Sequence, residues 1–225
     1  MIAIVGGDGS GKTLAVSGLS SWLGKNLDVV SVHLGKPRWS WTTRVVRTAL
    51  KIARAITRRP YVSASTLLYT QTASCSVFDL YCLSLRAVCL ARDRHRAYAR
   101  CRRLATTGRL VLCDRFSLPE ATTMEVPIID RFLNESRPSA LLEYLMRLER
   151  RYVDSIMPPE VLLVLRVHSA IAAQRRVGED SRVVTLRNDE IGKADWSRSP
   201  ARLIDANRSR GEVLAELKTA VWAAL

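Results

Sequence analysis

A glycine-rich stretch near the N-terminus constrains the fold of this chain more than any other feature of its sequence. It reads Gly-Gly-Asp-Gly-Ser-Gly-Lys-Thr over residues 6–13, follows the apolar run 2–5 and leads into a helix-compatible segment that ends at Gly24. The order of strand, loop and helix, with the spacing G-x-x-x-x-G-K-[ST], is typical of a phosphate-binding loop. A chance match in a glycine-rich turn is the alternative, and the strand before and the helix after count against it.

The residue types of this loop suit the phosphate chain of a nucleotide. Glycines let the backbone curl so that several N–H groups converge on an anion, and the next helix turns its positive end toward it. Lys12 reaches the β- and γ-phosphates, and the Thr13 hydroxyl sits on Mg²⁺. We therefore expect ATP and Mg²⁺ as ligands, and nucleotide contacts from Gly7, Asp8, Gly9, Ser10, Gly11, Lys12, Thr13 and Leu14.

Length and composition favour a single globular domain over residues 1–225. Hydrophobic residues make up 48% of the chain and charged residues 25%, which is usual for soluble proteins. The five cysteines include no C-x-x-C pair, and we expect them to be reduced and the protein to be cytoplasmic. No signal peptide is apparent, and the longest uncharged run, 60–78, is too polar to cross a membrane. The net charge of +14 indicates acidic ligands or surfaces.

Apolar runs alternate with helical patterns along the whole chain. Short buried strands are predicted at 2–5, 29–33, 110–113, 161–167 and 203–204, and helices near 12–24, 41–58, 77–106, 138–155, 169–176 and 209–223. This alternation predicts a parallel sheet of about five strands with helices on both faces. Such sheets bind ligands at the carboxyl ends of their strands, where the glycine-rich loop lies.

Asp114 and Arg115 follow the third predicted strand and are candidates for the same site. A carboxylate at a strand end beside a triphosphate can orient Mg²⁺, directly or through water. An arginine next to it offers a planar cation suited to phosphate. We expect Thr13 and Asp114 to position the metal, although a helix cap or a salt bridge would also explain the aspartate. The triplet Asp-Arg-Phe recurs at 130–132, but only the first copy follows a well-formed strand.

An arginine-rich segment at about 175–190 follows the fourth predicted strand. Spreading negative charge on a migrating phosphoryl group calls for cations, and a segment that closes over it excludes water. We therefore interpret this segment as a lid, with an exposed arginine-rich loop as the alternative. Its candidate residues are Arg175, Arg176, Arg182 and Arg187.

The segment 37–59 is a basic helical insert. Apolar residues recur here at roughly helical intervals and alternate with arginines and lysines. The apolar members are Trp41, Val45, Leu50, Ile52, Ala53 and Ile56. Packing of the apolar residues on the protein body is the simplest interpretation. Contact with an anionic membrane surface or an acidic partner is the second, and nucleic-acid binding is the least favoured because no nucleic-acid module is visible.

With these residues in view, the chain resembles the thymidylate kinase family of nucleoside monophosphate kinases. The loop 6–13 is similar to that family's G-x-D-x-x-G-K-[ST], and residues 90–94 are similar to its helical A-A-D-R segment. Residues 111–116 resemble its strand-end D-R-[YF] motif. Residues 163–176 resemble its approach to the lid, and residues 203–206 its closing I-D-A segment. The resemblance spans most of the chain.

The resemblance implies ATP-dependent phosphoryl transfer to a small acceptor, most readily a nucleoside monophosphate such as dTMP. Arg94 and Arg115 would hold the acceptor, Asp8 would orient it, and Ala206 would lie near the adenine. Gly9 resembles the branch of the family whose catalytic arginines come from the lid. This places weight on Arg175, Arg176, Arg182 and Arg187. A homodimer is a further implication of the family.

Two departures leave the acceptor open. Val5 stands where the family has a glutamate, and residues 34–41 keep a proline and an arginine but not the family's acceptor pattern. A sugar or another metabolite as acceptor is therefore an alternative. A nucleotide-binding regulatory protein without efficient transfer is another, because of the net charge and the basic insert.

Overall fold

The structure, a computed structural model, describes residues 1–35, 37–58, 76–116, 129, 139–176, 178, 180–197 and 199–225. These residues form two compact units, each of which is described by itself. The sheet unit comprises Met1–Gly35, Tyr98–Val126 and Met157–Leu225, and the helical unit comprises Lys36–Ala97 and Pro127–Ile156. The sequence predicts a single domain over residues 1–225. Because the two units are described separately, that stays a prediction. The second Asp-Arg-Phe triplet lies outside the described residues.

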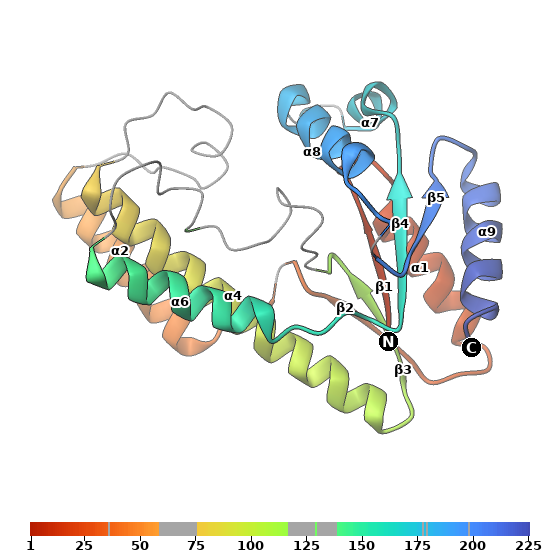
Figure 1. The fold of residues 1–225 in the computed structure, drawn as a ribbon, viewed down its shortest axis with the longest axis horizontal. Helices are drawn as coiled ribbons and strands as arrows, with labels where there is room; N and C mark the ends of the chain where they lie inside the picture. The colour runs from red at the N-terminus through yellow and green to blue at the C-terminus, as the bar shows by residue number, and fades with distance from the viewer. Residues whose placement is uncertain are drawn as a thin grey trace. The chain divides into compact units, whose positions relative to one another are not determined.

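A five-stranded, all-parallel sheet forms the centre of the sheet unit (Figure 1). The strand order is β2-β3-β1-β4-β5. The strands are β1 (Ile2–Gly6), β2 (Val29–His33), β3 (Leu110–Asp114), β4 (Val161–Arg166) and β5 (Ala201–Asp205). The prediction of an α/β fold with about five parallel strands is thus confirmed. Only the last strand is clearly longer than its apolar pattern suggests, because it is less buried than the three central strands.

Helices flank the sheet and cover its apolar faces. They are α1 (Lys12–Leu23), α7 (Ser169–Arg175), α8 (Ser181–Lys193) and α9 (Arg210–Trp222), together with the last turns of α4 (Val77–Thr106). One core joins alternate residues of β1 and β4, such as Ile4 and Leu163, to Leu19 of α1 and Leu217 of α9. Hydrogen bonding with the Cys101 thiol of α4, together with burial, raises the pKa of the Cys113 thiol in β3.

The segment that we interpreted as a lid contains a regular helix. Despite the glycine and acidic residues between its arginines, the segment contains a 13-residue helix, α8. The carboxylate of its N-cap residue, Asp180, accepts a hydrogen bond from the N–H of Arg182 at 3.0 Å. Val184 and Ile191 are its buried apolar anchors. This helix has no clear signal in the sequence, because two apolar anchors among charged residues give a weak helical period.

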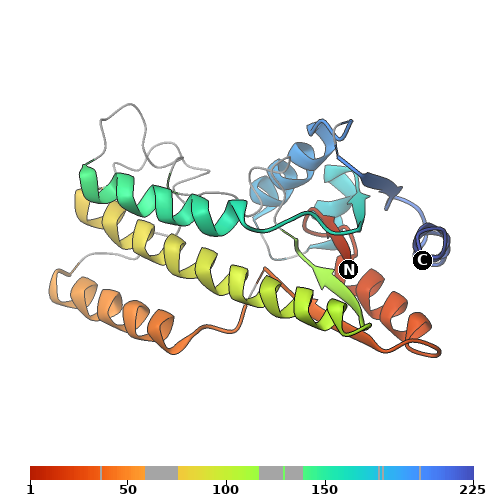
Figure 2. The same ribbon diagram turned by 60° about the horizontal axis from the view of Figure 1, so that its bottom comes forward.

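The helical unit contains α2 (Trp41–Ile56), the greater part of α4, and α6 (Ala140–Asp154). These helices lie side by side, with α4 in the middle (Figure 2). Ala87 and Val88 of α4 pack with Leu145 of α6, and Tyr81 hydrogen-bonds Ser139 at 2.7 Å. All three helices lie where the sequence predicts them, within a few residues at their ends. No described helix is long and apolar enough to cross a membrane.

Candidate functional site

The glycine-rich loop occupies the carboxyl end of the central strand, as the sequence predicts. Fully buried β1 ends at Gly6, the loop follows, and α1 begins at Lys12. Gly9 and Gly11 adopt left-handed φ angles of 80° and 86°, which glycine tolerates best. A Cβ on Gly9 would stand 2.7 Å from the carbonyl oxygen of Ala172 in α7. The sequence needs glycine here because both the turn and the close approach of α7 exclude a side chain.

Three consecutive carbonyl groups of the loop accept hydrogen bonds from side chains. Lys12 Nζ donates to Gly7 O at 2.5 Å, and Asn188 Nδ2 donates to Asp8 O at 2.9 Å. Arg175 Nη1 donates to Gly9 O at 3.4 Å. The loop backbone is thus fixed by α1, α7 and α8 together.

Asp8 is a buried carboxylate held between two arginines. Arg187 of α8 donates to its Oδ2 at 2.5 Å, and Arg115 donates to its Oδ1 at 3.2 Å. Burial raises the pKa of Asp8, but the Arg187 hydrogen bond, with the charges of Arg187, Lys12 and Arg115, outweighs burial and lowers that pKa below its ordinary value. Asp8 is therefore an anion at neutral pH, and its charge stabilises the neighbouring cations of the loop.

Lys12 is the most perturbed cation of the site. Its side chain is buried, and burial, with the nearby charges of Arg115 and Arg176, lowers its pKa to about 8 despite the opposing effect of Asp8 and Asp114. A buried ammonium with neighbouring arginines is short of negative charge. An anion bound here would supply that charge.

Asp114 ends β3 beside the loop. It pairs in register with Ile4 of β1, and its Oδ2 lies 3.3 Å from His33 Nδ1. Asp114 Oδ1 and Ser10 Oγ are buried and have no hydrogen-bond partner among the described residues. Oxygen ligands of this kind fit Mg²⁺, which usually takes one or two carboxylates and completes its shell with water and phosphate. The described residues hold no cluster of three or more His, Cys, Asp or Glu side chains for a metal.

Arg115 follows Asp114 in a strained backbone conformation. Its φ is 58°, which is uncommon for a residue with a side chain. The Arg115 N–H donates to Ile4 O at 3.3 Å, and this bond ties the turn to β1. Strain of this kind often marks a functional position.

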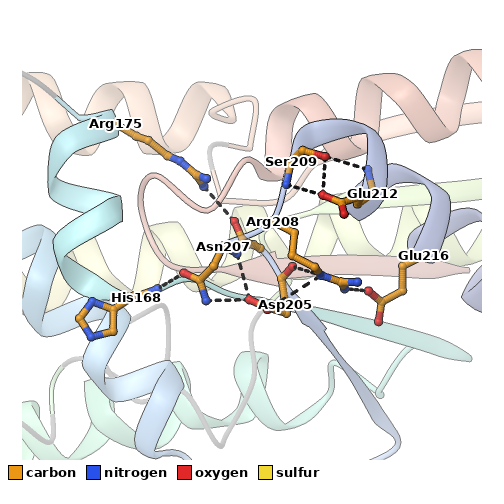
Figure 3. A network of polar contacts seen from close by, with 9 residues as sticks. His168, Arg175, Asp205, Asn207, Arg208, Ser209, Glu212 and Glu216 are labelled. Carbon is orange, nitrogen blue, oxygen red and sulfur yellow. Dashed lines mark hydrogen bonds and ion pairs between the residues drawn. The ribbon is translucent and has the colours of Figure 1, made fainter.

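The turn after β5 meets the same loop through Arg175. The guanidinium of Arg175 donates to Ala206 O at 3.0 Å as well as to Gly9 O. Figure 3 shows Arg175 reaching toward this turn, where Asn207 joins the backbone of His168 to Asp205. Arg175 therefore joins the I-D-A segment to the loop, and the expected place of an adenine near Ala206 stays a prediction. Leu14, also expected near the nucleotide, is exposed on the first turn of α1.

The other candidate arginines divide into two groups. Arg176 is exposed, and its charge is close enough to lower the pKa of Lys12. Arg182 is exposed at the start of α8 and does not contact the loop in the part of the chain that the structure describes. Arg94 belongs to the helical unit.

In the helical unit, the residues that precede Arg94 hold the start of α2. Asp93 is buried and accepts from the Ser40 N–H at 3.1 Å, while Arg92 donates to Ser40 Oγ at 2.8 Å and to Thr42 Oγ1. Asp93 thus has a structural role here, which the motif alone does not reveal.

The sequence patterns do not identify two residues of the site, Asn188 and His33, and they suggest a different role for a third, Arg187. Asn188 and His33 carry no pattern that would select them, because each acts through a partner distant in the chain. Arg187 stands in the predicted arginine cluster, but the sequence gives no sign that it pairs with Asp8.

The chain matches no model of a known protein family. It also matches none of the curated proteins with which it was compared.

Proposed function

We propose that this protein transfers the γ-phosphoryl group of ATP to a small acceptor. The observation that carries the proposal is the convergence of Lys12, Arg115, Arg175 and Arg187 on one glycine-rich loop at the carboxyl end of a parallel sheet. These cations come from four separate segments, and together with Arg176 they outnumber the two carboxylates beside them, Asp8 and Asp114. A site with this excess of charge suits a triphosphate.

The loop would hold the phosphate chain with its backbone and with the start of α1. Gly11, the N-cap of α1, offers no side chain to the first N–H groups of the helix, and the first turn contains no acidic residue. Those N–H groups and the helix dipole are therefore available to an anion. Lys12 would leave the Gly7 carbonyl and bind the β- and γ-phosphates.

Thr13 and Asp114 would hold Mg²⁺, directly or through water. A bound Mg²⁺ neutralises phosphate charge and so lowers the barrier to transfer. Arg187 and Arg115 both bind Asp8 in the structure. With ATP bound, each would donate some of its hydrogen bonds to the migrating phosphoryl group instead. The adenine would lie beside Arg175, Ala206 and Leu14.

The resemblance to thymidylate kinases favours a nucleoside monophosphate as acceptor, with dTMP the first to test. The altered segment 34–41 supports a second candidate, a sugar or another metabolite on the same scaffold. A panel of nucleoside monophosphates and sugars, followed by release of ADP with Mg²⁺ present, separates the two. ATP binding with no transfer to any acceptor would contradict the proposal and favour a regulatory protein.

Lys12→Ala tests the role of the loop. We expect turnover to fall by at least about a hundredfold, because a lysine that neutralises the transferred phosphate is lost. Lys25→Ala is the matched control, since Lys25 is an exposed lysine beyond the end of α1. Equal turnover in the two variants, with unchanged circular dichroism, would exclude the assignment.

A further inference from the structure

One side of helix α2 contacts α4 at both ends of the helix. At its start, Ser40 caps the helix and is held by Asp93 and Arg92 of α4. Near its end, Arg54 is buried and pairs with Asp79 of α4 at 3.8 Å. Polar contacts with α4 therefore anchor α2 at its two ends.

The opposite side of α2 carries a row of exposed apolar side chains, which we call the apolar stripe. Its members are Trp41, Val45, Ile52 and Ile56. Their spacings of four, seven and four residues place them on one helix face. Trp41 is 75% exposed and Ile56 is 77% exposed, so the stripe is open along the whole helix. Single exposed apolar residues are ordinary, but a continuous row marks an interaction surface.

Cations border the stripe. Arg44, Arg47, Lys51 and Arg58, with Arg86 of α4, line a hollow of about 920 Å³ beside α2. The buried Arg54, which pairs with Asp79, also lines it but is not part of this exposed row of cations. Trp39 forms one wall, and the Arg47 guanidinium lies 3.8 Å from the centre of its ring. No carboxylate lines this hollow among the described residues. The surface thus combines an apolar row with a neighbouring row of positive charge.

We propose that α2 docks this protein onto an anionic lipid surface. The helix would lie flat, with the apolar stripe in the boundary between headgroups and acyl chains and the cations on lipid phosphates. Trp41 suits this depth because its ring is apolar and its N–H is polar. At 16 residues, or about 24 Å, the helix lies on a bilayer rather than crossing it.

Charge decides between a membrane and the other occupants of such a face. A second copy of this chain would bring the rows of cations together, in a molecule that already carries +14. An acidic protein would satisfy the cations but would not by itself require four exposed apolar residues in a row. An anionic bilayer satisfies both features at once.

The experiment compares sedimentation of the full chain with vesicles of phosphatidylcholine alone and vesicles that also contain phosphatidylglycerol. We expect binding to the anionic vesicles only. Ile52→Ser with Ile56→Ser should weaken it at least about tenfold, since two branched apolar side chains no longer enter the lipid. The control pair is Leu27→Ser with Met157→Ser, which are exposed apolar residues in loops of the sheet unit and should bind normally.

A second pair of variants separates the local row of cations from the net charge. Arg44→Glu with Lys51→Glu should abolish binding, whereas Lys25→Glu with Arg103→Glu should retain most of it. Both pairs lower the net charge equally, and all four residues are exposed. Circular dichroism and thermal midpoints confirm that each variant is folded.

Tryptophan emission gives a readout that does not depend on a destabilising change. Anionic vesicles should shift the emission of the protein to shorter wavelength, and Trp41→Phe should remove that shift while Trp222→Phe keeps it. Absence of binding, or equal loss in test and control pairs, would overturn the proposal. So would concentration-dependent self-association lost with the stripe, or binding to soluble polyglutamate that matches binding to vesicles.

Discussion

Arg187 and Asp8 lie 179 positions apart in the chain and are joined by a 2.5 Å hydrogen bond. The bond links α8 to the turn after β1. Arg115, from the end of β3, binds the other oxygen of the same carboxylate. One buried acid thus holds two cations from different parts of the fold at the place where we propose that phosphate binds.

Arg187→Ala should reduce turnover more than it reduces stability. The change leaves Asp8 with Arg115 as its main partner, and removes one cation from the migrating phosphoryl group. We expect a fall in kcat/KM of about ten- to a hundredfold. Steady-state kinetics measure it, with Arg182→Ala, an exposed arginine of the same helix, as the control. A larger effect of the control would reverse the two assignments.

Gly7 and Asn188 should show strong coupling in stability. A Cβ on Gly7 would stand only 1.9 Å from Asn188 Oδ1, so Gly7→Ala forces the asparagine away from the bonds that it donates to Asp8 O and Val184 O. We expect Gly7→Ala to lower the free energy of unfolding by about 1–3 kcal/mol, since buried groups lose their partners.

The coupling is measured by urea unfolding of Gly7→Ala, Asn188→Ala and the double variant. The double variant should be clearly less destabilised than the sum of the single variants, because the clash needs both residues. Gly192→Ala is the matched control, since nothing lies within 4 Å of an added Cβ there. Strict additivity of the two changes in unfolding free energy would show that a Cβ on Gly7 does not clash with Asn188.

Lys12 should make the ligand-free protein more stable at alkaline pH. Its pKa is about 8 in the folded protein, against an ordinary value of 10.5. Between these values the unfolded chain binds more protons at this residue, so its contribution to the free energy of unfolding rises with pH. The penalty for burying the charge is present in full below about pH 8 and relieved toward pH 10.

Comparison of wild type with Lys12→Met isolates this effect. The difference in stability between them should shift in favour of the wild type by up to about 3 kcal/mol from pH 7 to pH 10. Urea midpoints at several pH values measure it. A constant difference across this range would mean that Lys12 is not buried as a cation.

Asp114→Asn should raise the Mg²⁺ concentration needed for half-maximal turnover. Asp114 Oδ1 is buried and has no hydrogen-bond partner among the described residues, and the amide removes the charge that attracts the metal. We expect a shift of at least about tenfold in a magnesium titration of ADP release. His33→Asn, which changes the partner of the other oxygen, should leave the titration nearly unchanged. Identical titrations for Asp114→Asn and wild type would remove this residue from the metal site.

Much of the fold was predicted from local patterns alone. Runs such as 110–113 and 161–167 are apolar enough to be buried on both faces, and the long helix α4 lies where the sequence predicts one, near 77–106. The loop was predicted because its glycines and Lys12 are adjacent in sequence. Helix α8 was missed because its apolar anchors are too few to set a period.

The sequence by itself determined the parallel sheet, the glycine-rich loop at the end of its first strand and the supply of arginines around it. Those features depend on neighbouring residues, whose spacing sets both the local backbone and the buried face. Only the tertiary structure decided that Arg187 pairs with Asp8, that Asn188 holds the loop carbonyl, and that the apolar stripe of α2 is exposed. These depend on which segments distant in the chain are brought within hydrogen-bonding range, and no local period encodes that.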